Sequence, residues 1–285
     1  IYGGSYPSTP YTKNIEGRGP AWANSLFEDN AEFGFGMRIA AETMRDRIQN
    51  IMAENIDKVD NDLKELFTKW LENRNSGIIT REIEKDIIKG IEASNNEAVK
   101  EILAVKDHLV KRSQWIFGGD GWAYDIGFGG LDHVIANNED VNILVLDTEV
   151  YSNTGGQSSK SSQTGSIAKF TAAGKPGKKK DLAAIAMSYG HVYVATVSSG
   201  YSQAQVIKAF AEAESYPGPS LIIAYSPCIA HGIKGGLSNS QHQSALATEC
   251  GYWPTFRFDP RLAETGQNPF KLDSKVPNWD KYDDF

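Results

Sequence analysis

Two stretches decide the fold of this chain: WIFGGDGW at residues 115–122 and VNILVLDTEVYSNTGGQ at residues 141–157. Each opens with a short run of apolar residues and then turns into glycines and oxygen-bearing side chains. Nearly continuous apolar runs are typical of parallel strands that helices cover on both faces. The sequence therefore predicts strands at Trp115–Phe117 and Val141–Asp147, each followed by a loop at its carboxyl end.

The same alternation continues toward the C-terminus. Further strands are predicted at His191–Ser198 and Ser220–Tyr225, with crossover helices at Asp181–Tyr189 and Tyr201–Ser215. Strands that alternate with helices predict a doubly wound, mostly parallel α/β sheet flanked by helices, here over residues 111–285.

The residues before this core have a different texture. Residues 37–110 are charged and poor in glycine, and apolar positions recur every three or four residues from Ile48 to Trp70, which predicts an amphipathic helical segment. Asn73–Gly77 breaks the pattern, and two more helices are expected after it. Residues 1–36 are rich in turn formers and are interpreted as an ordered lead-in. The acidic stretch Glu28–Glu32 suits a helix N-terminus.

Composition restricts the function only broadly. The 285 residues carry 29 positive and 36 negative side chains, a formal net charge of −7, which does not favour binding to nucleic acid or to anionic membranes. No apolar run approaches the roughly 18 residues that a membrane span needs, and the first residues lack the pattern of a signal peptide. A cytoplasmic location is the expectation.

The loop after the first core strand reads Gly118-Gly119-Asp120-Gly121-Trp122. Glycines let a ligand approach the backbone closely, and ligands of such sheets bind at the carboxyl ends of the strands. A carboxylate beside a phosphate requires a cation between them, and Mg²⁺ prefers oxygen ligands. This loop therefore indicates a metal and diphosphate pair.

The loop after the next strand supplies more oxygen donors. It begins at Asp147-Thr148-Glu149 and continues to Gln157, with Thr148 28 positions after Asp120. Taken singly, an Asp-Gly pair is usually a solvated turn, and clusters of Asn, Thr and Gly are usually ordinary loops. Two such loops on strands of one α/β unit favour a cation held from both sides.

Longer strings carry a family resemblance. GGDGWAYDIGFGGLDHV at 118–134, LDTEVYSNTGGQSSK at 146–160 and SYPGPSLIIAYSPC at 215–228 resemble the thiamine diphosphate-binding portion of pyruvate:ferredoxin (flavodoxin) oxidoreductases. RGPAWANSLFEDNAEFGFG at 18–36 and GYWPTFRFDPR at 251–261 are similar to the same family. The resemblance implies that residues 1–285 are the C-terminal, magnesium- and diphosphate-binding domain of a larger enzyme.

The resemblance also implies roles for single residues. The Mg²⁺ ligands would be the Asp120 carboxylate, the Thr148 hydroxyl and the Val150 carbonyl. Asn153 is similar to the family's asparagine near bound pyruvate and is the candidate catalytic residue. The expected cofactor-binding set is Gly119, Asp120, Gly121, Trp122, Thr148, Glu149, Val150, Tyr151, Ser152 and Asn153.

The two cysteines, Cys228 and Cys250, are too few for a disulfide framework or an internal metal site. Cys250 is interpreted as a buried small apolar residue. The resemblance makes Cys228 one of four ligands of a four-iron, four-sulfur cluster, a site that needs three more thiolates. We expect those three upstream of a chain that was cut from a longer polypeptide and is inactive alone.

The implied activity is oxidative decarboxylation of pyruvate with coenzyme A to acetyl-CoA and CO₂ in anaerobic metabolism. Electrons would leave through iron–sulfur clusters to ferredoxin or flavodoxin, and the full enzyme would be a homodimer. The lysine-rich run Lys175–Lys180 is interpreted as a solvated face that could guide an acidic ferredoxin. The scattered histidines show no zinc-ligand spacing and are interpreted as structural.

Two alternatives stay open. One is another thiamine diphosphate enzyme, either a different 2-oxoacid oxidoreductase or a decarboxylase, although a decarboxylase would have no use for a cluster ligand. The other is a non-redox module that binds Mg²⁺ and phosphate, which the absence of GxxxxGK[ST] and of GxGxxG after a strand disfavours.

Overall fold

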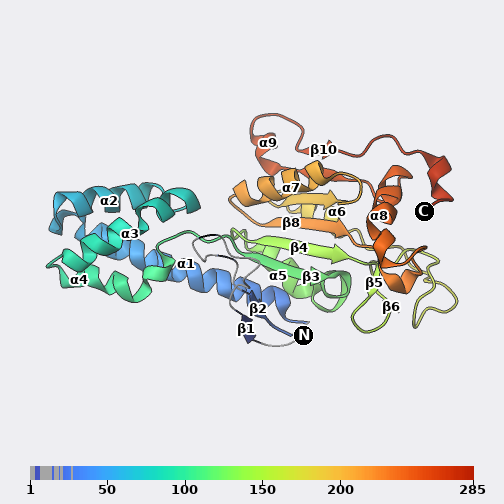
Figure 1. Ribbon diagram of the computed structural model, residues 1–285, viewed down its shortest axis with the longest axis horizontal. Coiled ribbons are helices and arrows are strands. Elements are labelled where there is room, and N and C mark those ends of the chain that lie inside the picture. The colour runs from blue at the N-terminus through green and yellow to red at the C-terminus, as the bar shows by residue number, and fades with distance from the viewer. Residues whose placement is uncertain (1–3, 7–14, 16–18, 20–21, 27) are drawn as a thin grey trace. The chain divides into compact units, whose positions relative to one another are not determined.

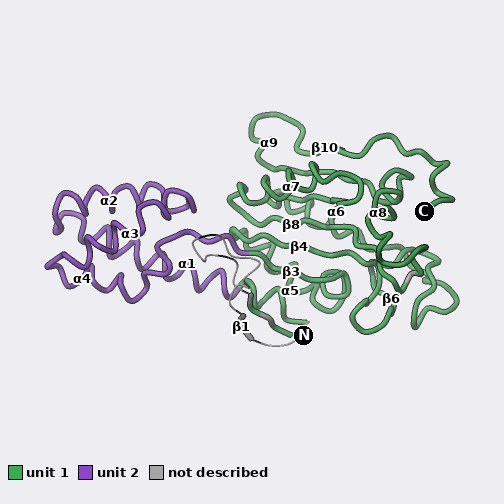
Figure 2. Tube along the Cα trace, in the orientation of Figure 1, with its two compact units in different colours: residues 1–35, 115–285 green, residues 36–114 purple. Residues whose placement is uncertain are grey.

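The computed structural model describes residues 4–6, 15, 19, 22–26 and 28–285 (Figure 1). Contacts divide the chain into two compact units, residues 1–35 with 115–285 and residues 36–114 (Figure 2). Much of the predicted lead-in lies outside the described residues. Within it, β1 (Gly4–Tyr6) pairs antiparallel with β2 (Trp22–Asn24).

A six-stranded sheet forms the centre of the first unit, in the order β10-β9-β7-β8-β4-β3. Strands β3, β4, β8 and β7 are parallel, and β9 and β10 add an antiparallel edge. The strands are β3 (Trp115–Gly119), β4 (Asn142–Asp147), β7 (Tyr193–Val197), β8 (Ser220–Tyr225), β9 (Phe256–Phe258) and β10 (Phe270–Leu272). The four predicted strands and the mostly parallel α/β class are confirmed, whereas β9 and β10 were not predicted.

Helices pack on both faces of this sheet because its strands are apolar on both sides. Val194 faces a core built with α5, α6 and the start of α1, while Tyr193 and Ala195 face a second core built with α7. The helices of the unit are η4 (Gly121–Ile126), α5 (Phe128–Ala136), α6 (Leu182–Ser188), α7 (Gln203–Ser215), η5 (Ile229–His231), η6 (Leu237–Asn239), α8 (Ser240–Glu249), α9 (Pro260–Glu264) and η7 (Trp279–Tyr282).

Side-chain caps fix where the two crossover helices begin. Asp181 accepts from Ala184 N at 2.9 Å ahead of α6, and Ser202 accepts from Gln205 N at 3.2 Å ahead of α7. Such caps satisfy backbone N–H groups that have no partner within the helix. Both helices lie within the predicted ranges.

The second unit is helical and has its own apolar core, which includes Phe67, Trp70 and Ile87. Its elements are α1 (Asn30–Asn55), which begins in the first unit, η2 (Ile56–Lys58), α2 (Asn61–Glu72), α3 (Gly77–Ala93), α4 (Glu97–Lys100) and η3 (Glu101–His108). The helical character, the break before Gly77 and the acidic start of α1 at Asn30 agree with the sequence pattern.

The structure corrects two details of the helical pattern. Helix α1 begins at Asn30, inside the stretch expected to be lead-in, and the run from Ile48 to Trp70 is broken at residues 56–60. The apolar spacing hides this break because Ile56 and Val59 still pack against the core. The signal that reports it is Asp60, whose side chain caps α2 by accepting from Leu63 N at 2.8 Å.

Candidate cofactor and cation site

The two predicted loops leave neighbouring strands at the same edge of the sheet. Strand β3 pairs in parallel with β4, and the last pair in register is Gly119 with Leu146. Asp120 and Thr148 therefore follow adjacent strand ends, although 28 positions separate them in sequence. The fold brings together the two loops that the sequence singled out.

Three oxygens gather where these loops meet. Thr148 Oγ1 lies 2.8 Å from Asp120 Oδ1 and 3.0 Å from the carbonyl oxygen of Val150. These are the side-chain and backbone oxygens that the resemblance names as Mg²⁺ ligands. Among the described residues, no three His, Cys, Asp or Glu side chains cluster as a metal site.

The chemistry of this donor set fits a small hard cation. Mg²⁺ takes oxygen ligands at 2.0–2.1 Å in octahedral geometry, which separates adjacent ligands by about 2.9 Å. The Thr148 hydroxyl carries one proton and cannot donate to the Asp120 carboxylate and the Val150 carbonyl together. A cation, by contrast, interacts favourably with all three oxygens.

Asp120 is buried in a way that leaves its charge poorly compensated. Its side chain is 1% exposed, with Oδ2 accepting from Ser159 Oγ at 2.6 Å and Oδ1 from the Thr148 amide at 3.2 Å. Burial, followed by the nearby Asp147 carboxylate, raises the pKa of Asp120 to about 6. A bound cation would relieve both effects.

The three glycines of the first loop differ in the space around their Cα atoms. A Cβ at Gly118 would lie 2.1 Å from the Trp122 ring, and one at Gly121 would lie 2.5 Å from the Tyr151 ring, so both glycines make room for aromatic side chains. At Gly119 the nearest atom would be the Leu146 carbonyl oxygen at 3.9 Å. Gly119 is thus the glycine of this loop with open space above it.

Trp122 belongs to the core of the sheet. Its side chain is 1% exposed and its Nε1 is buried without a hydrogen-bond partner. The ring also excludes a side chain at Gly127, where a Cβ would lie 2.1 Å away. Trp122 was predicted to bind the cofactor. Because its ring is buried in the core, only its backbone is available for that contact.

The carboxylate of Glu149 is bonded to groups other than the three oxygens. Its Oε1 lies 2.9 Å from Lys179 Nζ, and its Oε2 accepts from the Tyr252 hydroxyl at 2.6 Å. Lys179 also pairs with Asp147 at 2.8 Å, and its ammonium lies over the Trp253 ring, 4.9 Å from the centroid. Burial acts to lower the pKa of Lys179, but the carboxylates of Asp147 and Glu149 raise it, so the lysine stays charged.

The remaining predicted residues lie on a hairpin formed by β5 (Val150–Tyr151) and β6 (Gln157–Ser158). Asn153 is exposed on the connection between these strands. Ser152 Oγ lies 2.6 Å from Thr148 Oγ1 and 3.2 Å from Cys228 Sγ. The hairpin therefore brings the candidate cation ligands and Cys228 into one hydrogen-bonded group.

Cys228 follows the end of β8, the strand that pairs with β4. It is a free cysteine with 8% exposure, and Sγ also accepts from the Ala230 amide at 3.4 Å. Cys250 is free and completely buried, and its thiol contacts the Ala247 carbonyl oxygen, as expected for a packing residue.

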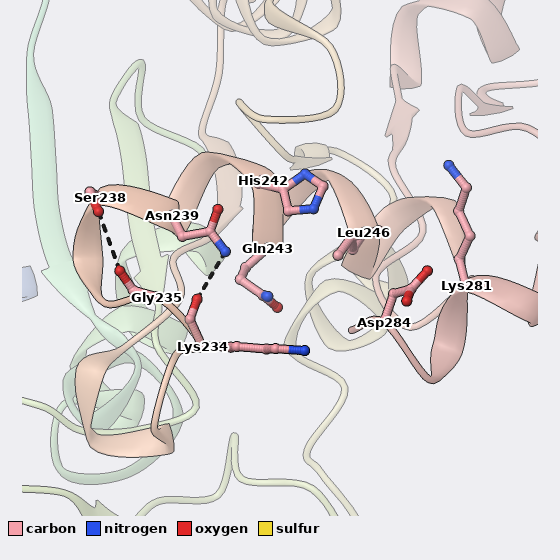
Figure 3. A pocket seen from close by; sticks show the side chains of 9 residues that line it. All are labelled: Lys234, Gly235, Ser238, Asn239, His242, Gln243, Leu246, Lys281 and Asp284. Carbon is pink, nitrogen blue, oxygen red and sulfur yellow. Dashed lines mark hydrogen bonds between the residues drawn. The ribbon is translucent and has the colours of Figure 1, made fainter.

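A separate pocket of about 740 Å³ lies along α8 in the same unit. Figure 3 shows Lys234, His242, Lys281 and Asp284 around it. None of the predicted site residues lines this pocket. Its volume alone gives no reason to prefer it over the converging oxygens of the two loops.

The structure corrects the interpretation of the lysine run as a solvated face. Lys179 has a side chain only 17% exposed, paired with Asp147 and Glu149, and Lys175 Nζ donates to the Ser162 carbonyl oxygen at 2.5 Å. Lys180 Nζ donates to the Tyr124 carbonyl oxygen at 2.9 Å and lies over the Phe128 ring. Of the four lysines, only Lys178 is exposed.

Sequence reasoning missed several residues that support the site. Ser159 holds Asp120, and Tyr252 holds Glu149 from 103 positions away. Nothing in the sequence pattern marks either residue. In the sequence, Lys179 is one residue of the basic run. Its distance along the chain from Asp147 and Glu149 does not predict that it pairs with them.

Comparison with known proteins finds a matching family model and several similar sequences. The family model described as "Thiamine pyrophosphate enzyme, C-terminal TPP binding domain" matches residues 101–224. The chain is 53% identical over 281 residues to pyruvate-flavodoxin oxidoreductase of Klebsiella pneumoniae, covering 97% of this chain and 24% of that protein. Over nearly its whole length, this chain is similar to pyruvate:ferredoxin (flavodoxin) oxidoreductases.

Two further relatives match with similar identity. Pyruvate:ferredoxin oxidoreductase of Moorella thermoacetica is 52% identical over 285 residues, covering 97% of this chain and 24% of that protein. The mitochondrial NADP⁺ pyruvate dehydrogenase of Euglena gracilis is 53% identical over 279 residues, covering 96% of this chain and 15% of that protein. The chain thus spans a quarter or less of these relatives.

No described helix is long and apolar enough to cross a membrane.

Proposed function

We propose that this chain binds Mg²⁺ and the diphosphate of thiamine diphosphate within a larger pyruvate:ferredoxin (flavodoxin) oxidoreductase. The observation that carries the proposal is the approach of Asp120 Oδ1, Thr148 Oγ1 and the Val150 carbonyl oxygen at the ends of β3 and β4. The match to a thiamine pyrophosphate-binding family supports the same assignment.

Within this proposal the three oxygens would hold the cation, and the cation would bind the diphosphate. Gly119, the backbone of Gly121 and Trp122, and the hairpin residues Tyr151 and Ser152 line the diphosphate. Glu149 contributes through its backbone, since its side chain is bonded to Lys179 and Tyr252. Ser159 keeps the Asp120 carboxylate turned toward Thr148.

Thiamine diphosphate, when bound, supplies the carbanion chemistry that cleaves the bond between the carboxylate and the carbonyl carbon of pyruvate. The role of this chain is to position that cofactor and to exclude water. Asn153, exposed on the connection between β5 and β6, is the proposed hydrogen-bond donor to pyruvate and would form one wall of its site.

Cys228 is the proposed ligand of a four-iron, four-sulfur cluster. A cluster of this type takes four thiolates, so the other three come from cysteines outside this sequence. The Ala230 amide suits a thiolate, and so does the Ser152 hydroxyl when its one proton goes to sulfur and not to Thr148 Oγ1, because hydrogen bonds to sulfur stabilise its negative charge.

For the whole enzyme we propose oxidation of pyruvate with coenzyme A to acetyl-CoA and CO₂, in anaerobic metabolism. Electrons would pass through the clusters to ferredoxin or flavodoxin, the acceptors in the names of two relatives. A cytoplasmic homodimer is part of the same proposal.

The test uses the full-length protein with Mg²⁺, thiamine diphosphate and coenzyme A. We expect pyruvate-dependent CO₂ release coupled to reduction of a low-potential acceptor, and loss of both reactions in Asp120→Ala. Turnover of 2-oxoglutarate in place of pyruvate would favour another oxidoreductase of the class. Release of CO₂ without acceptor reduction would favour a decarboxylase, and cation binding without either reaction would favour a phosphate-binding module.

A further inference from the structure

Glu149 lies between two of the proposed ligands and has an unusual backbone conformation. Its φ of 61° is in the left-handed region, which among the described non-glycine residues is shared only by Asn138 and Phe170. L-residues with a side chain adopt this region at a free-energy cost. Some other interaction must therefore hold the backbone at Glu149.

The backbone of Glu149 is fixed on both sides. Its N–H donates to Asp147 Oδ1 at 3.0 Å, and its carbonyl oxygen accepts a hydrogen bond from the Ser162 hydroxyl. Asp147 is completely buried and is held in turn by the Ser161 and Tyr124 hydroxyls. The turn after β4 is thus anchored to buried groups.

The side chain of Glu149 is anchored as well. Its carboxylate binds Lys179 and Tyr252, as described above, and Gln163 Nε2 lies 3.3 Å from Oε1. Lys179 and Tyr252 reach it from distant parts of the sequence. These partners bind the Glu149 carboxylate to groups other than the three candidate ligand oxygens.

The consequence of this turn is the arrangement of the residues on either side. Thr148 Oγ1 and the Val150 carbonyl oxygen lie 3.0 Å apart. In an extended strand, residues two positions apart are about 7 Å apart along the chain, so the turn at Glu149 is what brings these two oxygens together. We propose that Glu149 is a positioning residue, whose left-handed backbone, anchored through Lys179 and Tyr252, sets the separation of these two ligand oxygens. The inference rests on the proposed function, because it requires a cation at this point.

The test compares Glu149→Ala with Glu149→Gly in the full-length protein. Both variants lose the same side-chain contacts, but glycine adopts the left-handed region without the cost that alanine meets. Binding is measured with Mn²⁺ in place of Mg²⁺, in the presence of thiamine diphosphate, from the electron paramagnetic resonance signal of free Mn²⁺. Asn138→Ala, at φ 55° just after the end of α5, is the matched control for alanine in this region.

We expect Mn²⁺ affinity to fall in the order wild type, Glu149→Gly, Glu149→Ala, with the glycine variant about tenfold tighter than the alanine variant. Asn138→Ala should bind Mn²⁺ like the wild type. Equal affinities of the two Glu149 variants, or wild-type affinity in Glu149→Ala, would overturn the inference. If the alanine variant does not fold, Glu149→Asn against Glu149→Thr gives the same contrast, since Asn favours this region and Thr avoids it.

Asp120→Asn separates this inference from the proposed function. Wild-type Mn²⁺ affinity in Asp120→Asn would remove the cation site itself, and with it the premise. Loss of binding in Asp120→Asn together with unchanged binding in Glu149→Ala would reject only the role of Glu149.

Discussion

The Ser152 hydroxyl lies 3.2 Å from Cys228 Sγ and 2.6 Å from Thr148 Oγ1. One side chain thus connects the loop that holds the candidate cation ligands with the cysteine proposed to bind a cluster. The contact arises because β4 and β8 are neighbours, so that the hairpin after β4 extends over the segment that follows β8.

Ser152→Ala should lower the midpoint potential of the cluster that Cys228 binds. Hydrogen bonds to cluster sulfurs favour the reduced, more negative state, and one bond of about 1 kcal/mol corresponds to roughly 40 mV for a single electron. A redox titration followed by electron paramagnetic resonance measures the shift, on the signal that Cys228→Ser alters. Ser152→Thr keeps the hydroxyl and serves as the control. An unchanged potential in Ser152→Ala would show that the bond does not reach the cluster.

Lys179→Met should destabilise the protein strongly, by about 3–5 kcal/mol, because it leaves two buried carboxylates without their cation. Asp147 and Glu149 have side-chain exposures of 0% and 8%. The exposed neighbour Lys178 provides the matched control, and Lys178→Met should change the melting temperature little. Similar melting temperatures for the two variants, measured by calorimetry, would contradict the importance of the buried pair.

Substitutions at the glycines of the first loop should separate packing from cofactor binding. Gly118→Ala should lower the melting temperature because its Cβ would strike the Trp122 ring. Gly119→Ala should leave the melting temperature of the cofactor-free protein nearly unchanged and weaken thiamine diphosphate binding. Gly129→Ala, where a Cβ would meet nothing within 4 Å, is the control for both measurements. Full cofactor affinity in Gly119→Ala would mean that the diphosphate does not approach this glycine.

Asp120→Asn should stabilise the cation-free protein, and more so at pH 7 than at pH 5. The pKa of Asp120 is raised from 3.8 to about 6 by burial and by Asp147. In the pH range between these two pKa values, the folded state binds more protons than the unfolded state. The free energy of unfolding therefore falls as pH rises through this range, by roughly 3 kcal/mol in total. Melting temperatures in the presence of EDTA give the difference between variant and wild type. A difference that is equal at pH 5 and pH 7 would contradict this cost of ionising Asp120.

The parallel core could be predicted from the sequence because long apolar runs such as Val141–Leu146 are typical of strands that helices cover on both faces. The short edge strands β9 and β10 were not predicted, because three residues are too few to show the alternation of apolar and polar side chains that distinguishes a strand from a loop. The same limit applies to the break at residues 56–60, where Ile56 and Val59 keep the spacing of apolar residues while the α-helix gives way to the short 3₁₀ helix η2.

The candidate ligands could be named from the sequence because Asp120 and Thr148 follow directly after recognisable strands. The residues that hold these ligands and Glu149 in place could not be predicted in this way. Ser159, Lys179 and Tyr252 reach the site from loops and from the end of α8, and only the folded chain brings them to Asp120 and Glu149. Lys179 shows why local charge misleads, since a basic run looks solvated until its acidic partners are known.

The central claim is that Asp120, Thr148 and Val150 hold Mg²⁺ and, through it, the diphosphate of thiamine diphosphate. Calorimetric titration of thiamine diphosphate into the full-length protein, with and without Mg²⁺, tests it most directly. Asp132→Asn is the control, since it removes one negative charge from α5, at a carboxylate that accepts from the Tyr189 hydroxyl at 2.7 Å. We predict Mg²⁺-dependent binding in the wild type and in this control, and its loss in Asp120→Ala. Undiminished Mg²⁺-dependent binding in Asp120→Ala would contradict the assignment.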